Sequence, residues 1–383
     1  MENFVVSARK YRPSDFKSVV GQDHITVTLK NAIKNNHLAQ AFLFCGPRGV
    51  GKTTCARILA KTINCKNITP ELEACNNCDS CKSFNTSASM NIHELDAASN
   101  NSVDDIRNLV EQVRYSPQSG KYKIYIIDEV HMLSNQAFNA FLKTLEEPPS
   151  YAIFILATTE KHKIIPTILS RCQIFDFNRI QVADIANHLQ FIADKEEIES
   201  EEEALNLIAQ KADGALRDAL SMFDLIVTFS AGSKLTYQAT IDNLHILDYD
   251  YYFKITQSLH QENIGEAMLI FDEILKLGFD GHNFIVGLSS HFRNLMVCKD
   301  NATIKLLQVS ENVQKKYKEQ ANAVSLSFLL TALNIANQSD INYKSSKNQR
   351  LHVEICLMKM AHINAALTMT ASQHGEALKK KVS

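Results

Sequence analysis

The sequence has 383 residues, of which 45% are hydrophobic, so it can form two or three globular domains with buried cores. Its 40 lysines and arginines nearly balance 42 aspartates and glutamates, which excludes a protein held to nucleic acid by its overall charge. No apolar run approaches the roughly 20 residues of a membrane span, and the first residues lack a secretory-signal pattern. We therefore expect a cytoplasmic protein with no membrane contact.

The segment GPRGVGKT at residues 46–53 fills the pattern of a phosphate-binding loop. The apolar run 41–45 before it predicts a buried strand, and the spacing of residues 52–63 predicts a helix. In this arrangement backbone N–H groups at the helix N-terminus face an anion, Lys52 reaches the β- and γ-phosphates, and Thr53 offers its hydroxyl to Mg²⁺. The predicted phosphate-binding residues are Gly46, Pro47, Arg48, Gly49, Val50, Gly51, Lys52, Thr53 and Thr54.

Four of the nine cysteines lie close together in the sequence. They are Cys65, Cys75, Cys78 and Cys81, and the polar spacers between them fit a small metal module at about residues 64–82. Four thiolates at this spacing predict a structural Zn²⁺ site, because a closed set of protein ligands leaves no position for catalysis. An iron–sulfur cluster and a site without metal are the alternatives. The other five cysteines lie in apolar stretches and are expected to be core residues.

Strands and helices continue to alternate after the cysteines. Residues 92–96, 123–127 and 152–157 have the composition of strands, and helices are expected from Ser102 and over residues 135–145. Strands that alternate with helices indicate a parallel sheet with helices on both faces, which is the α/β class. Ligands bind such sheets at the carboxyl ends of the strands.

Two carboxylates and a threonine follow predicted strands at that edge. Asp128 is placed to hold Mg²⁺, and the adjacent Glu129 to polarise a water near the γ-phosphate. Because neighbours in an extended chain point to opposite sides, the pair fits two separate roles. Thr159 can bond the γ-phosphate or that water. The alternatives are a structural role for the carboxylates and a turn-capping role for the threonine.

Two arginines follow in the chain, and a guanidinium suits phosphate oxygens. Arg171 stands just before the apolar residues 174–175, and Arg217 stands at the start of a predicted helix. Taken alone, each arginine is better explained as an ordinary surface or ion-pair residue.

Helical periodicity dominates after residue 180. We expect a small helical domain over residues 180–243, a second helical domain over residues 244–370 and a solvated tail over residues 371–383. The apolar stripes of these helices are expected to form cores.

In this order and spacing, the motifs resemble those of the AAA+ ATPases of the clamp-loader branch. The cysteines after the loop helix, the opening ARKYRP at residues 8–13 with VVGQ at 19–22, and LDAAS at 95–99 make the chain similar to the gamma/tau subunits of bacterial DNA polymerase III. The resemblance implies a P-loop AAA+ domain over residues 1–179 with the zinc insertion, then the helical lid and a C-terminal helical oligomerisation domain, the collar.

The resemblance also implies roles for individual residues. Thr159 corresponds to sensor 1, Arg217 to a sensor 2 arginine acting on its own subunit's nucleotide, and Arg171 to an arginine finger for the ATP of a neighbour. Lys52, Thr53, Asp128 and Glu129 keep the roles given above. The adenine pocket is implied to be walled by Ala8, Tyr11, Val19 and Val20.

The implied function is that of an ATP-hydrolysing motor subunit that loads a sliding clamp onto primer-template DNA. The implied partners are the other subunits of a pentameric loader, the clamp and DNA, and the implied cofactors are ATP, Mg²⁺ and structural Zn²⁺. Two alternatives are another AAA+ DNA motor of the branch-migration type and a nucleotide-binding scaffold without turnover. The cysteines and Ser170-Arg171-Cys172 argue against the first, and intact Lys52 and Glu129 argue against the second.

Overall fold

The structure is a computed structural model that describes residues 5–86, 88–117, 120–230, 234–244, 247–307, 309 and 311–368. Its chain divides into two compact units, Met1–Leu235 and Thr236–Ser383. The predicted tail at 371–383 lies outside the described residues. None of the helices in the described ranges has both the length and the apolar character needed to cross a bilayer.

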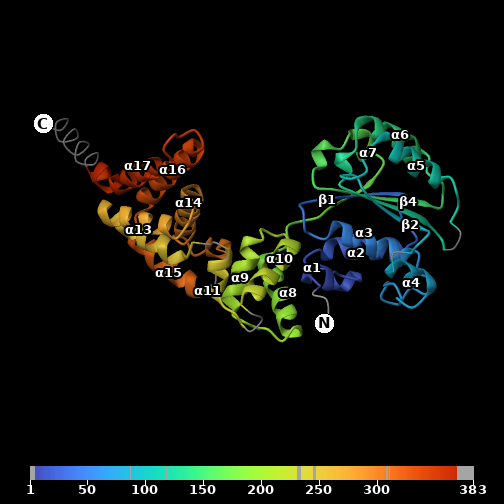
Figure 1. The fold of residues 1–383 in the computed structure, drawn as a ribbon, viewed down its shortest axis with the longest axis horizontal. Helices are drawn as coiled ribbons and strands as arrows, with labels where there is room; N and C mark the ends of the chain where they lie inside the picture. Colours follow the sequence, from blue (N-terminus) through green and yellow to red (C-terminus); the bar gives the residue numbers. More distant parts are fainter. Residues whose placement is uncertain are drawn as a thin grey trace. The chain divides into compact units, whose positions relative to one another are not determined.

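The first unit is built on a five-stranded parallel sheet (Figure 1). Its spatial order is β2-β3-β4-β1-β5. The strands are β1 Ala41–Cys45, β2 Ile92–Asp96, β3 Lys123–Asp128, β4 Ala152–Thr158 and β5 Gln173–Asp176. The α/β fold expected from the sequence is thus confirmed. Because β1 lies between β4 and β5, the loop after it opens between these two strands at the sheet's carboxyl edge.

Alternate residues of β1, β3 and β4 enter two separate cores, one on each face of the sheet. Phe42 and Ile126 belong to the core under α2 (Asp23–Lys34) and α3 (Lys52–Ile63). Leu43 and Ile127 belong to the core under α5 (Val103–Val113) and α6 (Asn135–Glu146). Figure 1 shows these two helical layers on opposite sides of the strands. Burial on both faces explains why β1, β3 and β4 read as continuous apolar runs.

The three helices that the sequence predicts in this domain begin where expected. Lys52 opens α3, and the side chains of Ser102 and Ser134 cap α5 and α6. The helices and 3₁₀ turns are α1 Ser7–Lys10, η1 Phe16–Ser18, α2 Asp23–Lys34, α3 Lys52–Ile63, α4 Asp79–Asn85, α5 Val103–Val113, η2 Val130–Met132, α6 Asn135–Glu146, η3 Lys161–Lys163 and α7 Pro166–Leu169.

Three helices complete the first unit. They are α8 Val182–Lys195, α9 Glu202–Lys211 and α10 Leu216–Phe229. Two short parallel strands, β6 Glu199–Ser200 and β7 Lys234–Leu235, join their ends. The sequence indicated only helices here, because two-residue strands have no detectable period.

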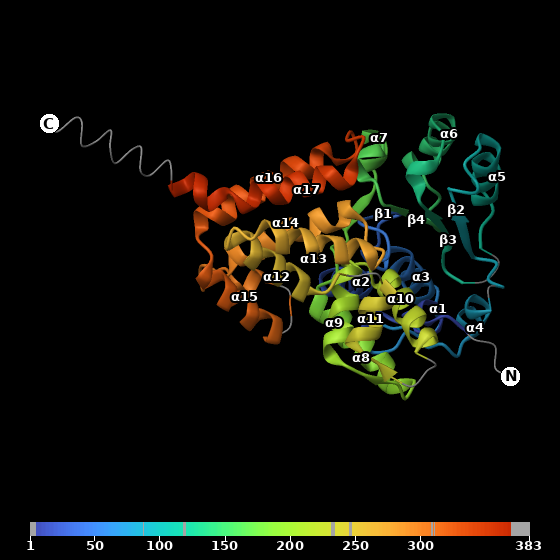
Figure 2. The same ribbon diagram turned by 60° about the vertical axis from the view of Figure 1, so that its left-hand side comes forward.

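The second unit consists of helices around one core. They are α11 Tyr237–Leu244, α12 Tyr249–His260, α13 Ile264–Lys276, α14 Gly281–Val297, η4 Ile304–Leu306, α15 Glu311–Ala323, α16 Leu326–Tyr343 and α17 Gln349–Ala361. Figure 2 shows α16 and α17 side by side along much of their length. Phe271, Phe284 and Phe328 are among the largest fully buried side chains of this core.

Candidate nucleotide-binding site

The glycines of the loop between β1 and α3 have conformations that other residues rarely adopt. Gly51 has a φ of 101° directly before α3, and a Cβ on it would meet no atom within 4 Å. A Cβ on Gly46 would lie 2.5 Å from the carbonyl oxygen of Phe177. The loop therefore folds tightly against the sheet edge at Gly46 and leaves open space beside the helix N-terminus at Gly51, where an anion is favoured.

A cavity of about 810 Å³ opens beside this loop. Most of the residues predicted to bind nucleotide line it: Ala8, Tyr11, Val19, Val20, Arg48, Gly49, Val50, Gly51, Lys52, Thr53, Thr54, Asp128, Glu129 and Arg217. Four predicted site residues do not line it: Gly46, Pro47, Thr159 and Arg171. Nine further residues line it that the predicted set lacks: Val6, Arg9, Arg12, Pro13, Glu94, Asp96, Ile180, Leu216 and Leu220.

Lys52 is buried and bends back over the loop. Its Nζ donates to the carbonyl oxygens of Gly46 and Pro47 at 2.8 and 2.7 Å. These two residues thus contact the lysine rather than the cavity. Burial lowers the pKa of Lys52, and the carboxylates of Glu129 and Asp128 partly oppose this shift.

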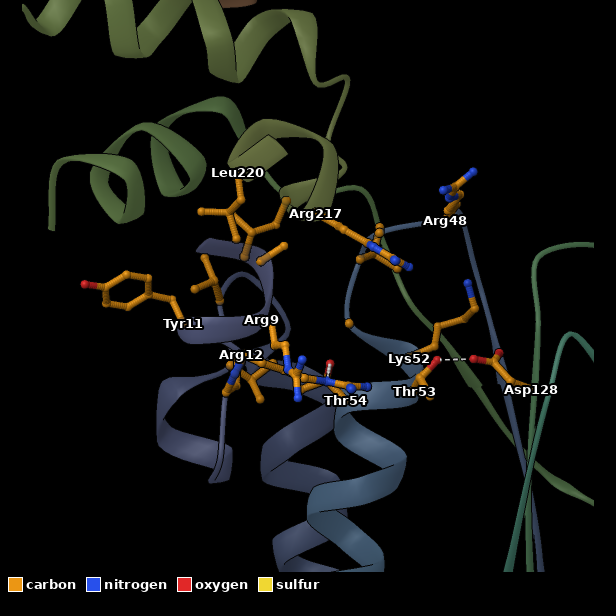
Figure 3. Close-up of a pocket in the computed structure, with 18 of the residues that line it drawn as sticks. Arg9, Tyr11, Arg12, Arg48, Lys52, Thr53, Thr54, Asp128, Arg217 and Leu220 are labelled. Atoms are coloured by element: carbon orange, nitrogen blue, oxygen red, sulfur yellow. Dashed lines mark hydrogen bonds between the residues drawn. The ribbon is translucent and has the colours of Figure 1, made fainter. Parts of the chain in front are cut away.

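Thr53 and Asp128 come together from α3 and the end of β3. The Thr53 hydroxyl donates to Asp128 Oδ2 at 2.5 Å, as Figure 3 shows. A hydroxyl and a carboxylate are hard oxygen donors of the kind that Mg²⁺ prefers. This donor pair at the base of the cavity therefore fits the magnesium site that the sequence predicts.

Glu129 lies in a left-handed conformation with φ 47° and ψ 44°, so the expectation of an extended Asp128-Glu129 pair is wrong. The chain turns sharply into η2 at this point instead of continuing β3. Glu129 Oε2 accepts from the backbone N–H and the hydroxyl of Thr159, at 3.2 and 3.0 Å. The turn still separates the two carboxylates, since Asp128 bonds Thr53 and Glu129 bonds the loop after β4.

His131, to which the sequence assigned no role, joins this group. Its Nδ1 lies 3.1 Å from Thr158 Oγ1 and 3.4 Å from Glu129 Oε2, and its Nε2 lies 3.1 Å from Glu160 Oε2. The side chain is only 7% exposed. His131 thus links Glu129 to the residues that follow β4.

Several arginines gather around the cavity. Arg217 at the start of α10 points into it in the direction of Lys52, and its backbone N–H bonds Gly49 O at 3.4 Å. Arg12 Nε donates to Thr54 Oγ1 at 3.2 Å. Burial lowers the pKa of Arg12, and Arg57 adds to the shift. Such a concentration of positive charge suits a ligand with several negative charges.

Arg171 lies elsewhere on the same unit. Its guanidinium donates to Thr167 O at 2.6 Å and forms an ion pair with Glu146 at 2.8 Å. The side chain is 33% exposed, so it is at the surface and not locked in the interior.

The predicted adenine wall comes from the N-terminal segment. Val19 and Val20 follow η1, whereas Ala8 and Tyr11 belong to α1 and its end. The ring of Tyr11 lies across the cavity from Lys52 in Figure 3, and its hydroxyl bonds Glu196, the residue directly after α8. The Ser7 backbone N–H donates to Asp224 of α10 at 2.7 Å.

The four clustered cysteines meet in space. The sulfur atoms of Cys65, Cys75, Cys78 and Cys81 all lie within 4.8 Å of one another. Sulfur atoms around one tetrahedral Zn²⁺ stand about 3.8 Å apart. Backbone N–H groups lower the pKa of Cys75, while burial raises that of Cys81. The geometry and the donor type therefore fit the predicted metal module.

The strand–loop–helix, the paired Thr53 and Asp128, and the basic cavity define a P-loop nucleotide-binding protein. Three family models match consecutive parts of the chain. They are described as "DNA polymerase III, delta subunit" at residues 21–181, "DNA polymerase III clamp loader subunit, ATPase lid domain" at 184–232, and "DNA polymerase III subunits gamma and tau domain III" at 235–373.

Curated relatives carry names from the same system. DNA polymerase III subunit gamma of Buchnera aphidicola subsp. Baizongia pistaciae is 34% identical over 94% of this chain and 98% of its own length. DNA polymerase III subunit tau of Bacillus subtilis is 41% identical over 94% of this chain and 64% of its own length. The chain belongs to the gamma/tau subunit family of bacterial DNA polymerase III.

The coverage of these relatives differs. The chain matches 64% of the length of the Bacillus subtilis protein and 44% of the Escherichia coli tau subunit, to which it is 41% identical. Among solved structures, a Thermotoga maritima RuvB branch-migration motor is 19% identical with a TM-score of 0.47, covering 65% of this chain and 79% of that one. A likeness at that level adds nothing to the assignment.

Proposed function

We propose that this chain is the ATP-hydrolysing motor subunit of a bacterial clamp loader. It couples ATP binding and hydrolysis to the opening of a sliding clamp and its loading onto primed DNA. The observation that carries the proposal is the single cavity lined by Lys52, Thr53, Asp128, Glu129 and Arg217 in a chain of the gamma/tau family. Companion subunits, the clamp and primer-template DNA are its proposed partners.

The phosphate end of the site depends on three side chains and on the backbone at the start of α3. Lys52 and the N–H groups at the start of α3 bind the β- and γ-phosphates. Thr53 and Asp128 hold Mg²⁺, which neutralises charge on the β- and γ-oxygens when it is bound. The 2.5 Å contact between the two side chains supports their sharing of one cation.

Glu129 is the proposed base that orients the attacking water. In this structure its carboxylate accepts two hydrogen bonds from Thr159, so Thr159 contacts the base rather than the cavity. A carboxylate held in this way must turn toward the γ-phosphate before it can take a proton from water. Thr159, as the proposed sensor 1, is then placed to link Glu129 to the state of the nucleotide.

The two arginines act in different subunits. Arg217 reaches the cavity of its own chain and is proposed to bind the phosphates there as sensor 2. Arg171 lies outside that cavity and is 33% exposed, which supports a role as a finger for a neighbouring subunit's ATP. An arginine supplied by a partner stabilises the spread charge of the transition state and contributes roughly 10³–10⁵ in rate. Hydrolysis then requires a correctly closed assembly.

The remaining regions have proposed structural roles. The AAA+ domain covers residues 1–179, the lid 180–243 and the collar 244–370. The cysteines hold a structural Zn²⁺, since four protein thiolates close its coordination shell. The adenine base lies against Ala8, Tyr11, Val19 and Val20.

Steady-state ATPase in a reconstituted loader tests the proposal. We expect ATP turnover to rise when the sliding clamp and primed DNA are added together to this chain and its companion subunits. The control is Lys52→Ala, which loses the principal phosphate ligand and is expected to hydrolyse no ATP. ATP turnover that does not change when clamp and DNA are added would contradict a role in clamp loading. ATP turnover by Lys52→Ala equal to that of the wild type would contradict the proposed nucleotide site.

A further inference from the structure

One carboxylate of the loop between Cys65 and Cys75, that of Glu73, contacts a distant segment of the chain. The Thr69 N–H donates to Glu73 O at 2.9 Å, and the Glu73 N–H donates to Thr69 Oγ1 at 3.2 Å. Leu72 takes a left-handed conformation, with φ 63°, and packs against the core under α2 and α3. This closed turn fixes the backbone from which the Glu73 side chain extends.

The Glu73 carboxylate bonds the N-terminal segment rather than its own loop. Its oxygens accept from the backbone N–H groups of Phe16 at 2.9 Å and Lys17 at 3.2 Å. Lys30 of α2 forms an ion pair with it at 2.7 Å. The Glu73 side chain is only 14% exposed, so solvent screens these contacts weakly.

These contacts lie next to the cavity wall. Phe16 and Lys17 are the first residues of η1, and the residues after η1 are Val19 and Val20, which line the cavity. Farther along, Gln22 Nε2 donates to Asn178 O at 2.7 Å. The short wall segment is therefore held on one side by Glu73 and on the other by Gln22.

The cysteine module also contacts the helix of the phosphate-binding loop. Lys61 of α3, only 4% exposed, donates from Nζ to Asn76 Oδ1 at 2.8 Å. Asn76 stands between Cys75 and Cys78. The module is thus fixed to α3, and through Glu73 it fixes η1 at a set position relative to that helix.

We propose that Glu73 is a positioning residue that sets the adenine wall of the nucleotide site. It acts through η1, places Val19 and Val20 against the base, and contacts no nucleotide itself. This inference rests on the proposed nucleotide function. Because Lys52 and the loop glycines make none of these contacts, Glu73 controls the binding of the base and not that of the phosphates.

Binding of two ligands separates these effects. We compare ATP with inorganic tripolyphosphate, each with Mg²⁺, by titration calorimetry on the full chain. Loss of a charged, weakly screened set of hydrogen bonds in Glu73→Ala is expected to weaken ATP binding about ten-fold and leave tripolyphosphate binding unchanged. Glu71→Ala is the matched control, because Glu71 lies in the same loop with an exposed side chain; it is expected to bind both ligands as the wild type does.

A second, milder variant keeps the test valid if Glu73→Ala does not fold. Glu73→Gln keeps one acceptor oxygen and is expected to weaken ATP binding less than Glu73→Ala does, again without effect on tripolyphosphate. Unchanged ATP binding in the Glu73 variants, or equal loss of both ligands, overturns the inference. Failure of the wild type to bind either ligand would instead overturn the nucleotide site itself.

Discussion

Glu129 is the residue whose environment says most about how the site is controlled. Its left-handed backbone aims the carboxylate at Thr159, which donates two hydrogen bonds to it. A carboxylate held by these two bonds has to turn toward the γ-phosphate before it can take a proton from water. We infer that the loop after β4 must shift before hydrolysis begins.

Replacing Glu129, the proposed base, tests this at the level of one atom. Glu129→Gln keeps the size of the side chain but removes its ability to take a proton, so ATP turnover is expected to fall about 10²–10⁴-fold. ATP binding is expected to stay near the wild-type value, because Lys52 and Thr53 are untouched. Binding by calorimetry and turnover by phosphate release measure the two effects, and wild-type turnover in the variant would remove the assignment.

At the scale of elements, α3 connects two sites. Its first residues, Lys52 and Thr53, face the cavity, whereas Lys61 near its end bonds the cysteine module. Cys65 follows directly after the helix ends. Replacement of the cysteines is therefore expected to lower the stability of the whole nucleotide-binding domain.

Metal analysis tests the cysteine module. We expect about one Zn²⁺ per chain, lost when Cys78 and Cys81 are both replaced by serine, because hydroxyls bind Zn²⁺ poorly. The same change is expected to lower the thermal midpoint of the first unit, since metal binding free energy adds to folding free energy. A wild-type protein whose first unit has the same thermal midpoint without metal as with Zn²⁺ would contradict a structural zinc site.

A buried histidine predicts how the second unit responds to acid. His291 of α14 is 1% exposed; its Nδ1 lies 3.1 Å from Tyr317 Oη and its Nε2 lies 2.9 Å from Gln320 Oε1. Burial lowers its pKa to about 4. Below pH 6.5, His291 binds a proton in the unfolded chain but stays neutral in the folded chain. The folded state is therefore most stable above pH 6.5, and this stability is lost as the pH falls toward 4.

Denaturant unfolding of the second unit in the full chain measures this effect. Between pH 6.5 and pH 4, the unfolding free energy is expected to drop by up to about 3 kcal/mol from this residue alone. His291→Gln keeps polarity but has no proton to gain, so its unfolding free energy is expected to depend less on pH. An identical pH dependence in variant and wild type would contradict the prediction.

Much of the α/β architecture could be predicted from the sequence, because fully buried strands and capped helices leave strong local patterns. The predicted runs 41–45 and 52–63 coincide with β1 and α3. The sequence did not reveal β6 and β7, which are too short for a period. The boundaries at 180 and 244 stay predictions.

The residues of the candidate site could be predicted less completely than the fold. Residues in a contiguous motif, such as Thr53, lie at the cavity as expected. Asp96 was missed, although its place at the carboxyl end of β2 could have indicated it. Arg12 and Glu73 act across the chain, and their contacts depend on how separate segments fold together. Local sequence patterns do not contain that information.

At the scale of the whole molecule, the proposed active site needs a residue from a second chain. The described residues of this chain bring Arg217 to the cavity but leave Arg171 outside it, paired with Glu146. If Arg171 serves a neighbour, each active site belongs to two subunits, and assembly itself controls hydrolysis. If the subunits come into the correct contact only when clamp and DNA are bound, they would then hydrolyse ATP only in that complex.

Mixing two variants that are each expected to be inactive tests whether neighbouring subunits share an active site. Lys52→Ala lacks the phosphate-binding lysine but keeps its finger, and Arg171→Ala lacks the finger but keeps its own loop. Loaders assembled from either variant alone are expected to hydrolyse little ATP, whereas loaders assembled from an equal mixture are expected to regain part of the wild-type turnover at shared sites. Wild-type turnover by Arg171→Ala alone, or no recovery in the mixture, would contradict the proposal that Arg171 completes the active site of a neighbouring subunit.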